Sequence, residues 1–349
     1  MNKLILFAGS ILLTASLMTC QYPVDSSALP DPQKFLIIDA VLTDSFGKVN
    51  VDYTLTEVTP QGGYLFPTPP DATAYVLDSH GNRTDFIPDG TKNTSFRGVV
   101  GETYKLYVQA DGEIYESQAE TMPACPELDS LTPLYSRETS RSPDDLSYDG
   151  FDVYAQTTDL PTQENYYQWD WIHYRRLPSC DYVDGFLIPC TPYDCWGIVY
   201  NTQIVVQSDK LRDGQPLAQK VVRVPFATPP HKFYYLRVEQ RAITASAFAY
   251  LRSLETQTQN VGSIFDIPAQ TKFNPNVHNV NHPGEQILGV FSVYSARRKV
   301  LNINMQQKIN GVEAKVVIDL RPFTPIPLLQ APCTEGLYRT QIRPVGWLD

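Results

Sequence analysis

Residues 165–174 read NYYQWDWIHY, and residues 233–242 read FYYLRVEQRA. Both stretches are rich in aromatic side chains and alternate apolar with polar residues, which is typical of β-strands with one buried face. In the first stretch this alternation places Tyr167, Trp169 and Trp171 on the same face. We expect that face to form core. The alternative is that these aromatic side chains bind a sugar, a peptide or a partner protein at the surface.

The composition also favours a turn-rich β protein. The 349 residues include 28 Pro, 19 Gly, 21 Tyr and 15 Phe but only 4 Met, and this mixture suits short strands joined by tight turns. The 28 Lys and Arg residues against 38 Asp and Glu give a net charge of −10. A protein this acidic is not expected to bind nucleic acid, because that function needs a basic face.

Strand patterns and turns divide the chain into two β-rich regions. The short strands in residues 34–125 predict an immunoglobulin-like β-sandwich. Residues 126–349 predict a larger β-rich domain with one main helix near 244–258, where Thr244 or Ser246 can cap the first turn. The expected fold class is therefore mainly β, with an N-terminal sandwich followed by the larger domain.

Residues 1–19 predict a signal peptide. Lys3 supplies a positive charge, and the uncharged apolar stretch 4–17 follows it; this stretch is too short to span a hydrocarbon core of about 30 Å. It ends in LMTC at Cys20, which resembles a bacterial lipobox whose cysteine receives diacylglycerol. Residues 20–33 would then be a lipidated tether. The alternative is an ordinary signal peptide with an incidental cysteine. No later stretch approaches the roughly 18 apolar residues of a membrane helix, so we expect none.

Five cysteines remain after Cys20, and export would allow them to form disulfides. They are Cys125, Cys180, Cys190, Cys195 and Cys333. Because five is odd, at most two bridges form and one thiol is left over, and four of the five can be paired in fifteen ways. We expect Cys190 or Cys195 to pair with another of the five. Zinc is the alternative, but no C-x-x-C pair and no histidine at finger spacing supports it.

The sequence contains no recognisable catalytic or cofactor-binding motif. It lacks GxSxG, Walker A, GxGxxG and HExxH patterns, so we expect no catalytic residue and no cofactor. His278 and His282 have i,i+4 spacing but lie in the loop sequence NPNVHNVNHPG, which predicts a polar, hydrogen-bonded loop instead of a metal site. Asp144, Asp145 and Asp149 lack the spacing of a calcium loop, so we expect no bound metal.

The segment RVEQR places Arg237, Glu239 and Arg241 on the strand face opposite Val238. We expect a surface ion pair there, which contributes about 0–1 kcal/mol to stability. We interpret this motif as one that specifies the fold.

Several segments together resemble the domain-of-unknown-function-4249 family of Bacteroidetes-type outer-membrane lipoproteins. They are FLIIDAVLTD, VGETYKLYV, NYYQWDW, YYLRVEQRAITASAFAYLRSLETQTQNVGSIFDIP, NVHNVNHPGEQILGVFSVYSARRKVL and the ending Pro344-Val-Gly-Trp347. The resemblance covers residues 20–347. It implies a lipid-anchored protein at the cell surface or periplasmic face of the outer membrane, encoded beside a TonB-dependent receptor of the SusC type. The family has no established catalytic residues, so the resemblance assigns none.

The leading hypothesis is therefore a non-enzymatic accessory or binding lipoprotein, attached to the outer membrane by its N-terminal lipid and associated with a TonB-dependent receptor. One alternative is a surface hydrolase with an unrecognised active site, which converging carboxylates in a cleft would favour. The other is a structural or adhesive surface protein, which an exposed aromatic patch would favour.

Overall fold

The structure is a computed structural model of the 349-residue chain, which divides into two compact units, Met1–Lys34 and Phe35–Asp349. All described residues belong to the second unit, so the predicted signal peptide, tether and Cys20 lie outside them. Within the described part of the chain, no helix combines the length and the apolarity needed to cross a membrane. The described residues are 35–54, 57–58, 64–65, 67–137, 149–161, 163–177, 182–183, 186–187, 195–225, 233–259, 275–306, 333 and 335–348.

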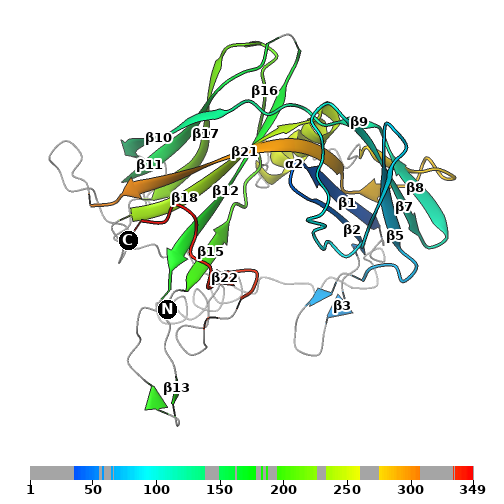
Figure 1. Ribbon diagram of the computed structural model, residues 1–349, viewed down its shortest axis with the longest axis horizontal. Coiled ribbons are helices and arrows are strands. Elements are labelled where there is room, and N and C mark those ends of the chain that lie inside the picture. The colour runs from blue at the N-terminus through cyan, green and yellow to red at the C-terminus, as the bar shows by residue number, and fades with distance from the viewer. Residues whose placement is uncertain are drawn as a thin grey trace, which may run out of the picture. The chain divides into compact units, whose positions relative to one another are not determined.

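A nine-stranded sheet is the largest element of the described residues (Figure 1). Its path is β2-β1-β21-β18-β12-β15-β22, while β16 pairs with β12 and β20 with β1. Neighbours are antiparallel except β1, which runs parallel to β20 and β21. The strands are β1 (Leu36–Thr43), β2 (Gly47–Tyr53), β12 (Tyr166–Arg176), β15 (Trp196–Tyr200), β16 (Val205–Ser208), β18 (Phe233–Ile243), β20 (Ile287–Leu288), β21 (Phe291–Asn304) and β22 (Arg339–Thr340).

Smaller sheets contain the other described strands. A six-stranded sheet has the order β19-β8-β7-β5-β6 with β9 paired to β7, and a three-stranded sheet has the order β10-β11-β17. Two further pairs are β3–β4 and β13–β14. Their bounds are β3 (Glu57–Val58), β4 (Tyr64–Leu65), β5 (Thr73–Asp78), β6 (Arg83–Phe86), β7 (Thr103–Ala110), β8 (Glu113–Ser117), β9 (Glu120–Thr121), β10 (Leu128–Arg137), β11 (Asp149–Thr158), β13 (Tyr182–Val183), β14 (Phe186–Leu187), β17 (Pro216–Pro225) and β19 (Val277–Asn279).

The long strand β21 contributes to two hydrophobic cores. Phe291 and Val293 pack with β1, β2 and the six-stranded sheet, whereas Leu301 and Ile303 pack with β12, β18 and the three-stranded sheet. Because these odd-numbered positions point to one side of a strand, both smaller sheets cover the same face of the nine-stranded sheet. In Figure 1, β21 is the long orange strand that reaches from one group of strands to the other.

The opposite face of the nine-stranded sheet carries the helix α2 (Ala245–Gln259). Phe248 of this helix packs against Tyr166 of β12, in a hydrophobic cluster that also includes Tyr294 of β21. Thr244 caps the helix, since its Oγ1 accepts a hydrogen bond from the amide of Ala247 at 3.5 Å. The helix predicted near 244–258 is therefore confirmed.

The mainly β fold is also confirmed, but its strands do not separate at residue 125. Strand β1 pairs in parallel with β21, with Ala40 opposite Phe291, so both predicted regions contribute to one sheet. Gly289 makes this approach feasible: its φ is +96°, and a Cβ there would lie 2.2 Å from the carbonyl oxygen of Ile38. Since β1 and β2 form no sheet of their own, the immunoglobulin-like topology stays a prediction.

Candidate functional site

The aromatic strand β12 does not offer a binding platform. Tyr167 and Trp169 are 0% and 1% exposed in the second core, and Trp171 is partly buried against it. The Tyr167 hydroxyl donates a hydrogen bond to Asp159 at 2.5 Å, and Trp169 Nε1 donates one to Gln240 Oε1 at 3.0 Å. The expectation that this face forms core is therefore confirmed for Tyr167 and Trp169, because the three-stranded sheet covers it and leaves neither ring exposed to a ligand.

Gln240 explains part of the RVEQR motif. It is fully buried on β18, and its Nε2 donates hydrogen bonds to the carbonyl oxygen of Pro126 at 3.1 Å and to Thr157 Oγ1 at 3.2 Å. With the bond from Trp169, the amide of Gln240 joins three separate segments of the core. Its neighbour Cys125 is a buried free thiol whose pKa is raised by burial to about 11, which leaves it protonated and unreactive at neutral pH.

The ion pair predicted for the same motif is larger and more buried than expected. Arg241 contacts Asp170 at 2.8 Å and Glu239 at 2.6 Å, and Arg298 also pairs with Glu239. Despite its burial, Glu239 has a lowered pKa, because Arg241 and Arg298 stabilise its carboxylate. The alternation in the sequence predicts which face carries these charged side chains. It does not predict that α2 packs on that face and reduces their exposure.

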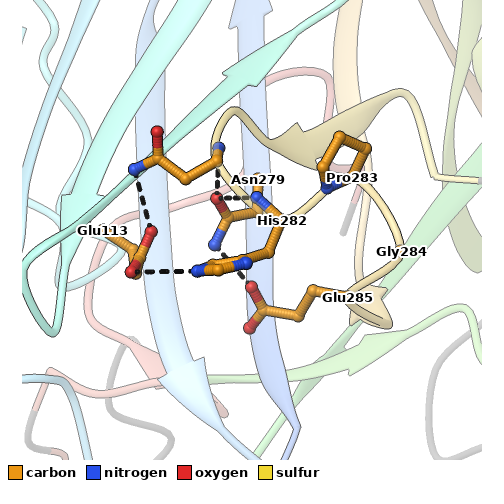
Figure 2. A pocket seen from close by; sticks show the side chains of 7 residues that line it. Glu113, Asn279, His282, Pro283, Gly284 and Glu285 are labelled. Carbon is orange, nitrogen blue, oxygen red and sulfur yellow. Dashed lines mark hydrogen bonds and ion pairs between the residues drawn. The ribbon is translucent and has the colours of Figure 1, made fainter.

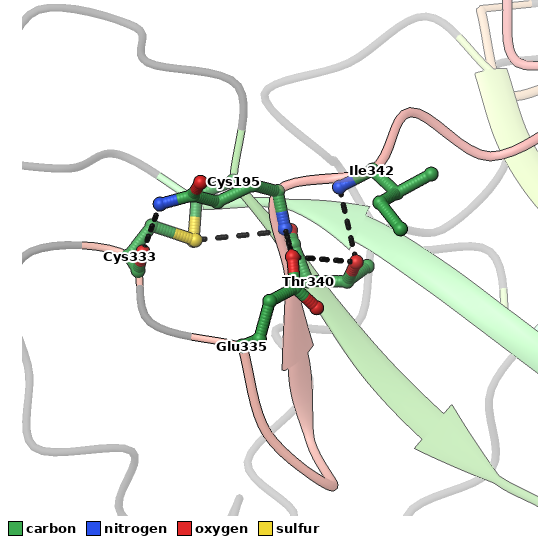
Figure 3. The surroundings of a disulfide bond; sticks show 6 residues. Cys195, Cys333, Glu335, Thr340 and Ile342 are labelled. Atoms are coloured by element: carbon green, nitrogen blue, oxygen red, sulfur yellow. Dashed lines mark hydrogen bonds between the residues drawn. A yellow bond between two sulfur atoms is a disulfide. The ribbon is translucent and has the colours of Figure 1, made fainter.

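Cys195 and Cys333 form a disulfide across a sequence separation of 138 residues (Figure 3). This is one of the pairings that the sequence leaves open. Cys180 and Cys190 lie outside the described residues, as does Cys20. The disulfide lies beside the turn that carries Glu335 and leads into β22. The disulfide joins Cys333, which precedes the segment 335–348, to Cys195, the residue just before β15. We call the segment 335–348 the strap.

Strand pairing and hydrogen bonds also fix the strap to the nine-stranded sheet. Strand β22 within it pairs with β15, with Thr340 opposite Trp196. The Glu335 carboxylate accepts hydrogen bonds from Gln341 N at 2.6 Å and from Thr340 Oγ1 at 3.2 Å, as Figure 3 shows. These contacts fix the backbone of the turn that follows the disulfide.

The far end of the strap is fixed by an aromatic cluster. Trp347 packs with Tyr235 and Trp196, and its ring centre lies 5.8 Å from that of Tyr235. The Tyr235 hydroxyl donates a hydrogen bond to the carbonyl oxygen of Val345 at 2.8 Å. Gly346 has a φ of +79°, a conformation that favours glycine, and this lets the chain turn Trp347 back onto the body.

The strap exposes large apolar side chains although its backbone is fixed. Their exposed fractions range from 48% for Leu348 to 87% for Val345. Tyr200 of β15 extends the surface, since its ring contacts that of Tyr338 and its hydroxyl donates to Leu337 O at 2.8 Å. An apolar surface on a fixed segment is a typical feature of contact sites for other molecules. The exposed side chains of the strap are Leu337, Tyr338, Ile342, Val345 and Leu348.

A shallow hollow of about 600 Å³ lies between β8 and the loop that follows β19 (Figure 2). The His282 ring lies between Glu113 and Glu285, and its Nε2 is 3.6 Å from Glu113 Oε1. The buried Asn279 donates to Glu285 at 2.6 Å and accepts from the His282 amide at 3.0 Å. The predicted polar, hydrogen-bonded loop is found after Asn279, but His278 lies on the strand β19, which pairs with β8 and which the sequence pattern does not predict. The groups that line the hollow bind each other, so the strap is the stronger candidate site.

Two buried carboxyl groups meet where β11 and β16 end. Asp159 and Asp209 are 2% and 1% exposed, and one oxygen of each lies within 4.8 Å of the other and of Asp213. Asp159 accepts a hydrogen bond from Tyr167, and Asp209 accepts one from Asn165 N at 2.9 Å. Burial raises the pKa of Asp209, and the neighbouring Asp159 raises it further.

We expect the stability of the Asp209→Asn variant, relative to the unmodified protein, to increase as pH rises. A group with a raised pKa in the folded state stabilises fully below its unfolded pKa, and this contribution is lost as pH rises through the folded pKa. The unfolding temperature of the variant, relative to that of the unmodified protein, should therefore rise as pH increases from about 4 through the raised pKa of Asp209. Thermal unfolding across this range is the measurement, with the exposed Asp85→Asn as control. Parallel curves for Asp209→Asn and the unmodified protein would contradict the expectation.

Comparison with known proteins places this fold in a family. The chain has no match among the curated proteins. A family model described as "Domain of unknown function (DUF4249)" matches residues 21–300, which is most of the 349-residue chain. The matched range contains most strands of the nine-stranded sheet, whereas β22 and the strap follow it. The chain therefore belongs to the DUF4249 family.

Proposed function

We propose that this protein is a non-enzymatic accessory lipoprotein that binds another membrane protein through its strap. In this proposal a lipid on Cys20 attaches it to the outer membrane, and residues 20–33 act as the tether. The proposal is supported by the lipobox-like sequence LMTC and by the exposed apolar side chains of the strap.

The fixed backbone of the strap is the observation that carries the proposal. The disulfide, the pairing of β22 with β15 and the packing of Trp347 hold the segment before any partner binds. A preorganised surface loses less conformational entropy on binding than a mobile one. A stable complex buries about 1,200–2,000 Å², so the partner would contact the strap and surfaces around it.

The partner that we propose is a TonB-dependent receptor of the SusC type. This part of the proposal comes from the family resemblance, which implies that such a receptor is encoded beside the lipoprotein. Contacts made mainly by apolar side chains are only weakly screened by salt. The complex should therefore persist at raised ionic strength.

Cys20→Ala is expected to move the protein from the membrane fraction to the soluble fraction. Each buried CH₂ of a lipid chain contributes about 0.8 kcal/mol to membrane binding, and the variant has no thiol to receive the lipid. Membrane sedimentation and labelling with a palmitate analogue measure the effect. Ser26→Ala, a change in the tether that keeps Cys20, should remain with membranes. A Cys20→Ala protein that still sediments and still labels would contradict the anchor.

Ile342→Asp is expected to abolish recovery of the membrane partner. The side chain of Ile342 is 73% exposed, so the change introduces a charge into the proposed contact without disturbing the core. Full-length tagged protein is purified in mild detergent at about 0.5 M salt, and the co-purifying proteins are quantified by mass spectrometry. We expect at least a tenfold loss of the receptor relative to the unmodified protein.

The matched control is Ile87→Asp. Ile87 is 63% exposed beside the six-stranded sheet, so the two variants replace the same residue type at similar exposure. Ile87→Asp should recover the receptor as well as the unmodified protein does. Equal recovery with Ile342→Asp would show that the strap is not the contact. A screen against glycans, peptides and esters tests the hydrolase alternative on the same preparations.

A further inference from the structure

Two arginines, one beside the strap and one within it, have no carboxylate partner among the described residues. They are Arg237 on β18 and Arg339 on β22. Glu239, the one acidic residue of β18, binds Arg241 and Arg298. Asp170 on the neighbouring strand β12 also binds Arg241. Guanidinium groups bind carboxylates in a planar, two-pronged geometry. An arginine that has no carboxylate partner and lies beside an apolar surface can bind a carboxylate of another molecule.

The position of Arg237 links it to both ends of the strap. Its guanidinium lies 5.8 Å from the centre of the Tyr174 ring. Burial raises the pKa of Tyr200 and Tyr235, and the charge of Arg237 opposes that rise in both, so Arg237 is close to each of them. Tyr200 donates a hydrogen bond to Leu337 O, and Tyr235 donates one to Val345 O. Arg237 therefore lies among the tyrosines that support the strap.

The strap differs in charge from the rest of the protein. The chain has a net charge of −10, but the strap carries Arg339 and Arg343 against the single acid Glu335. Glu335 already accepts hydrogen bonds from Thr340 and Gln341. With Arg237 beneath it, the strap is a positively charged, apolar surface on an acidic protein. Its electrostatic complement is a segment that carries both carboxylates and apolar side chains.

We propose that the strap binds an acidic segment of its partner, with a carboxylate of that segment on Arg237 and its apolar side chains against Ile342 and Val345. The inference rests on the proposed function, because it specifies the chemistry of the partner at the same surface. The arginine gives the contact a preferred position and charge, while the apolar side chains supply most of the buried area.

The test uses two synthetic probes with the purified full-length protein. One is an acetylated, amidated hexapeptide of alternating aspartate and leucine, and the other is its analogue with asparagine in place of aspartate. Titration calorimetry measures both dissociation constants. We expect the acidic peptide to bind at least about tenfold more tightly, because hydrogen bonds to a charged group are stronger than neutral ones. Arg237→Gln should remove most of this preference, and Arg237→Lys should keep part of it.

Arg212→Gln is the matched control. Arg212 lies in the exposed turn between β16 and β17, and it too has no carboxylate partner among the residues that the structure describes. This variant should keep the full preference for the acidic peptide. Equal binding of the two peptides, or an unchanged preference in Arg237→Gln, would overturn the inference. If that happens while Ile342→Asp still abolishes receptor recovery, the proposed function stands; if Ile342→Asp recovers the receptor normally, the proposed function fails.

Discussion

Replacing Cys195 and Cys333 together by alanine is expected to lower the free energy of unfolding by about 2–4 kcal/mol. The disulfide spans 138 residues, and a long closed loop restricts the unfolded chain more than a short one. The loss should be visible first at the strap, because β22 contributes only two residues to the sheet. Trp347 would then become more exposed to water, and its fluorescence would shift to longer wavelength.

The control for this experiment is Cys125→Ala. Cys125 is buried and not in a disulfide, so its replacement removes one sulfur from the core but no cross-link. Chemical denaturation with tryptophan fluorescence detection measures both variants. A double variant as stable as Cys125→Ala, with unchanged Trp347 fluorescence, would show that the disulfide does not hold the strap in place.

Gln240→Leu is expected to destabilise the protein by about 2–4 kcal/mol. The change removes the partner of the Trp169 Nε1–H and leaves the Pro126 carbonyl with only the weak thiol donor of Cys125. Both groups are inside the second core, where water cannot replace the lost bonds. Denaturant unfolding should show a lower midpoint with an unchanged slope.

Gln109→Leu provides the comparison for Gln240→Leu. Gln109 is on β7 with its side chain exposed, and surface substitutions of this kind usually change stability by no more than about 0.5 kcal/mol. If Gln240→Leu is no more destabilising than Gln109→Leu, the hydrogen-bond network around Gln240 does not stabilise the core. The motif RVEQR would then need another explanation.

The sequence predicts the elements of this fold better than their partners. Alternation identifies β12 and β18, and the apolar stripe with its cap identifies α2, because these signals are local. The same signals predict two strands over 288–295 and 300–305, whereas the structure has the short strand β20 (Ile287–Leu288) and then one continuous strand, β21 (Phe291–Asn304). They also give no information on which strands pair, so the parallel pairing of β1 with β21, about 250 residues apart in the chain, could not be predicted.

The candidate site was not predictable for a related reason. Alternation predicts that Tyr167 and Trp169 share a buried face, but it does not show that the three-stranded sheet is what covers that face. The strap has no periodic pattern, and its exposure depends on the disulfide to Cys195 and on the seating of Trp347. The one signal that points to it is the segment LYRTQIRPVGWL, in which apolar and polar residues mix without the period of a strand or of a helix.

Hydrogen–deuterium exchange of the full-length protein, alone and bound to its co-purified membrane partner, measures most directly whether the strap is the binding surface. Amide exchange reports burial and hydrogen bonding segment by segment. We expect binding to slow exchange in residues 335–348 and in the adjoining β15, with little change in the six-stranded sheet. Unchanged exchange in 335–348, with protection confined to the six-stranded sheet, would contradict the proposed function.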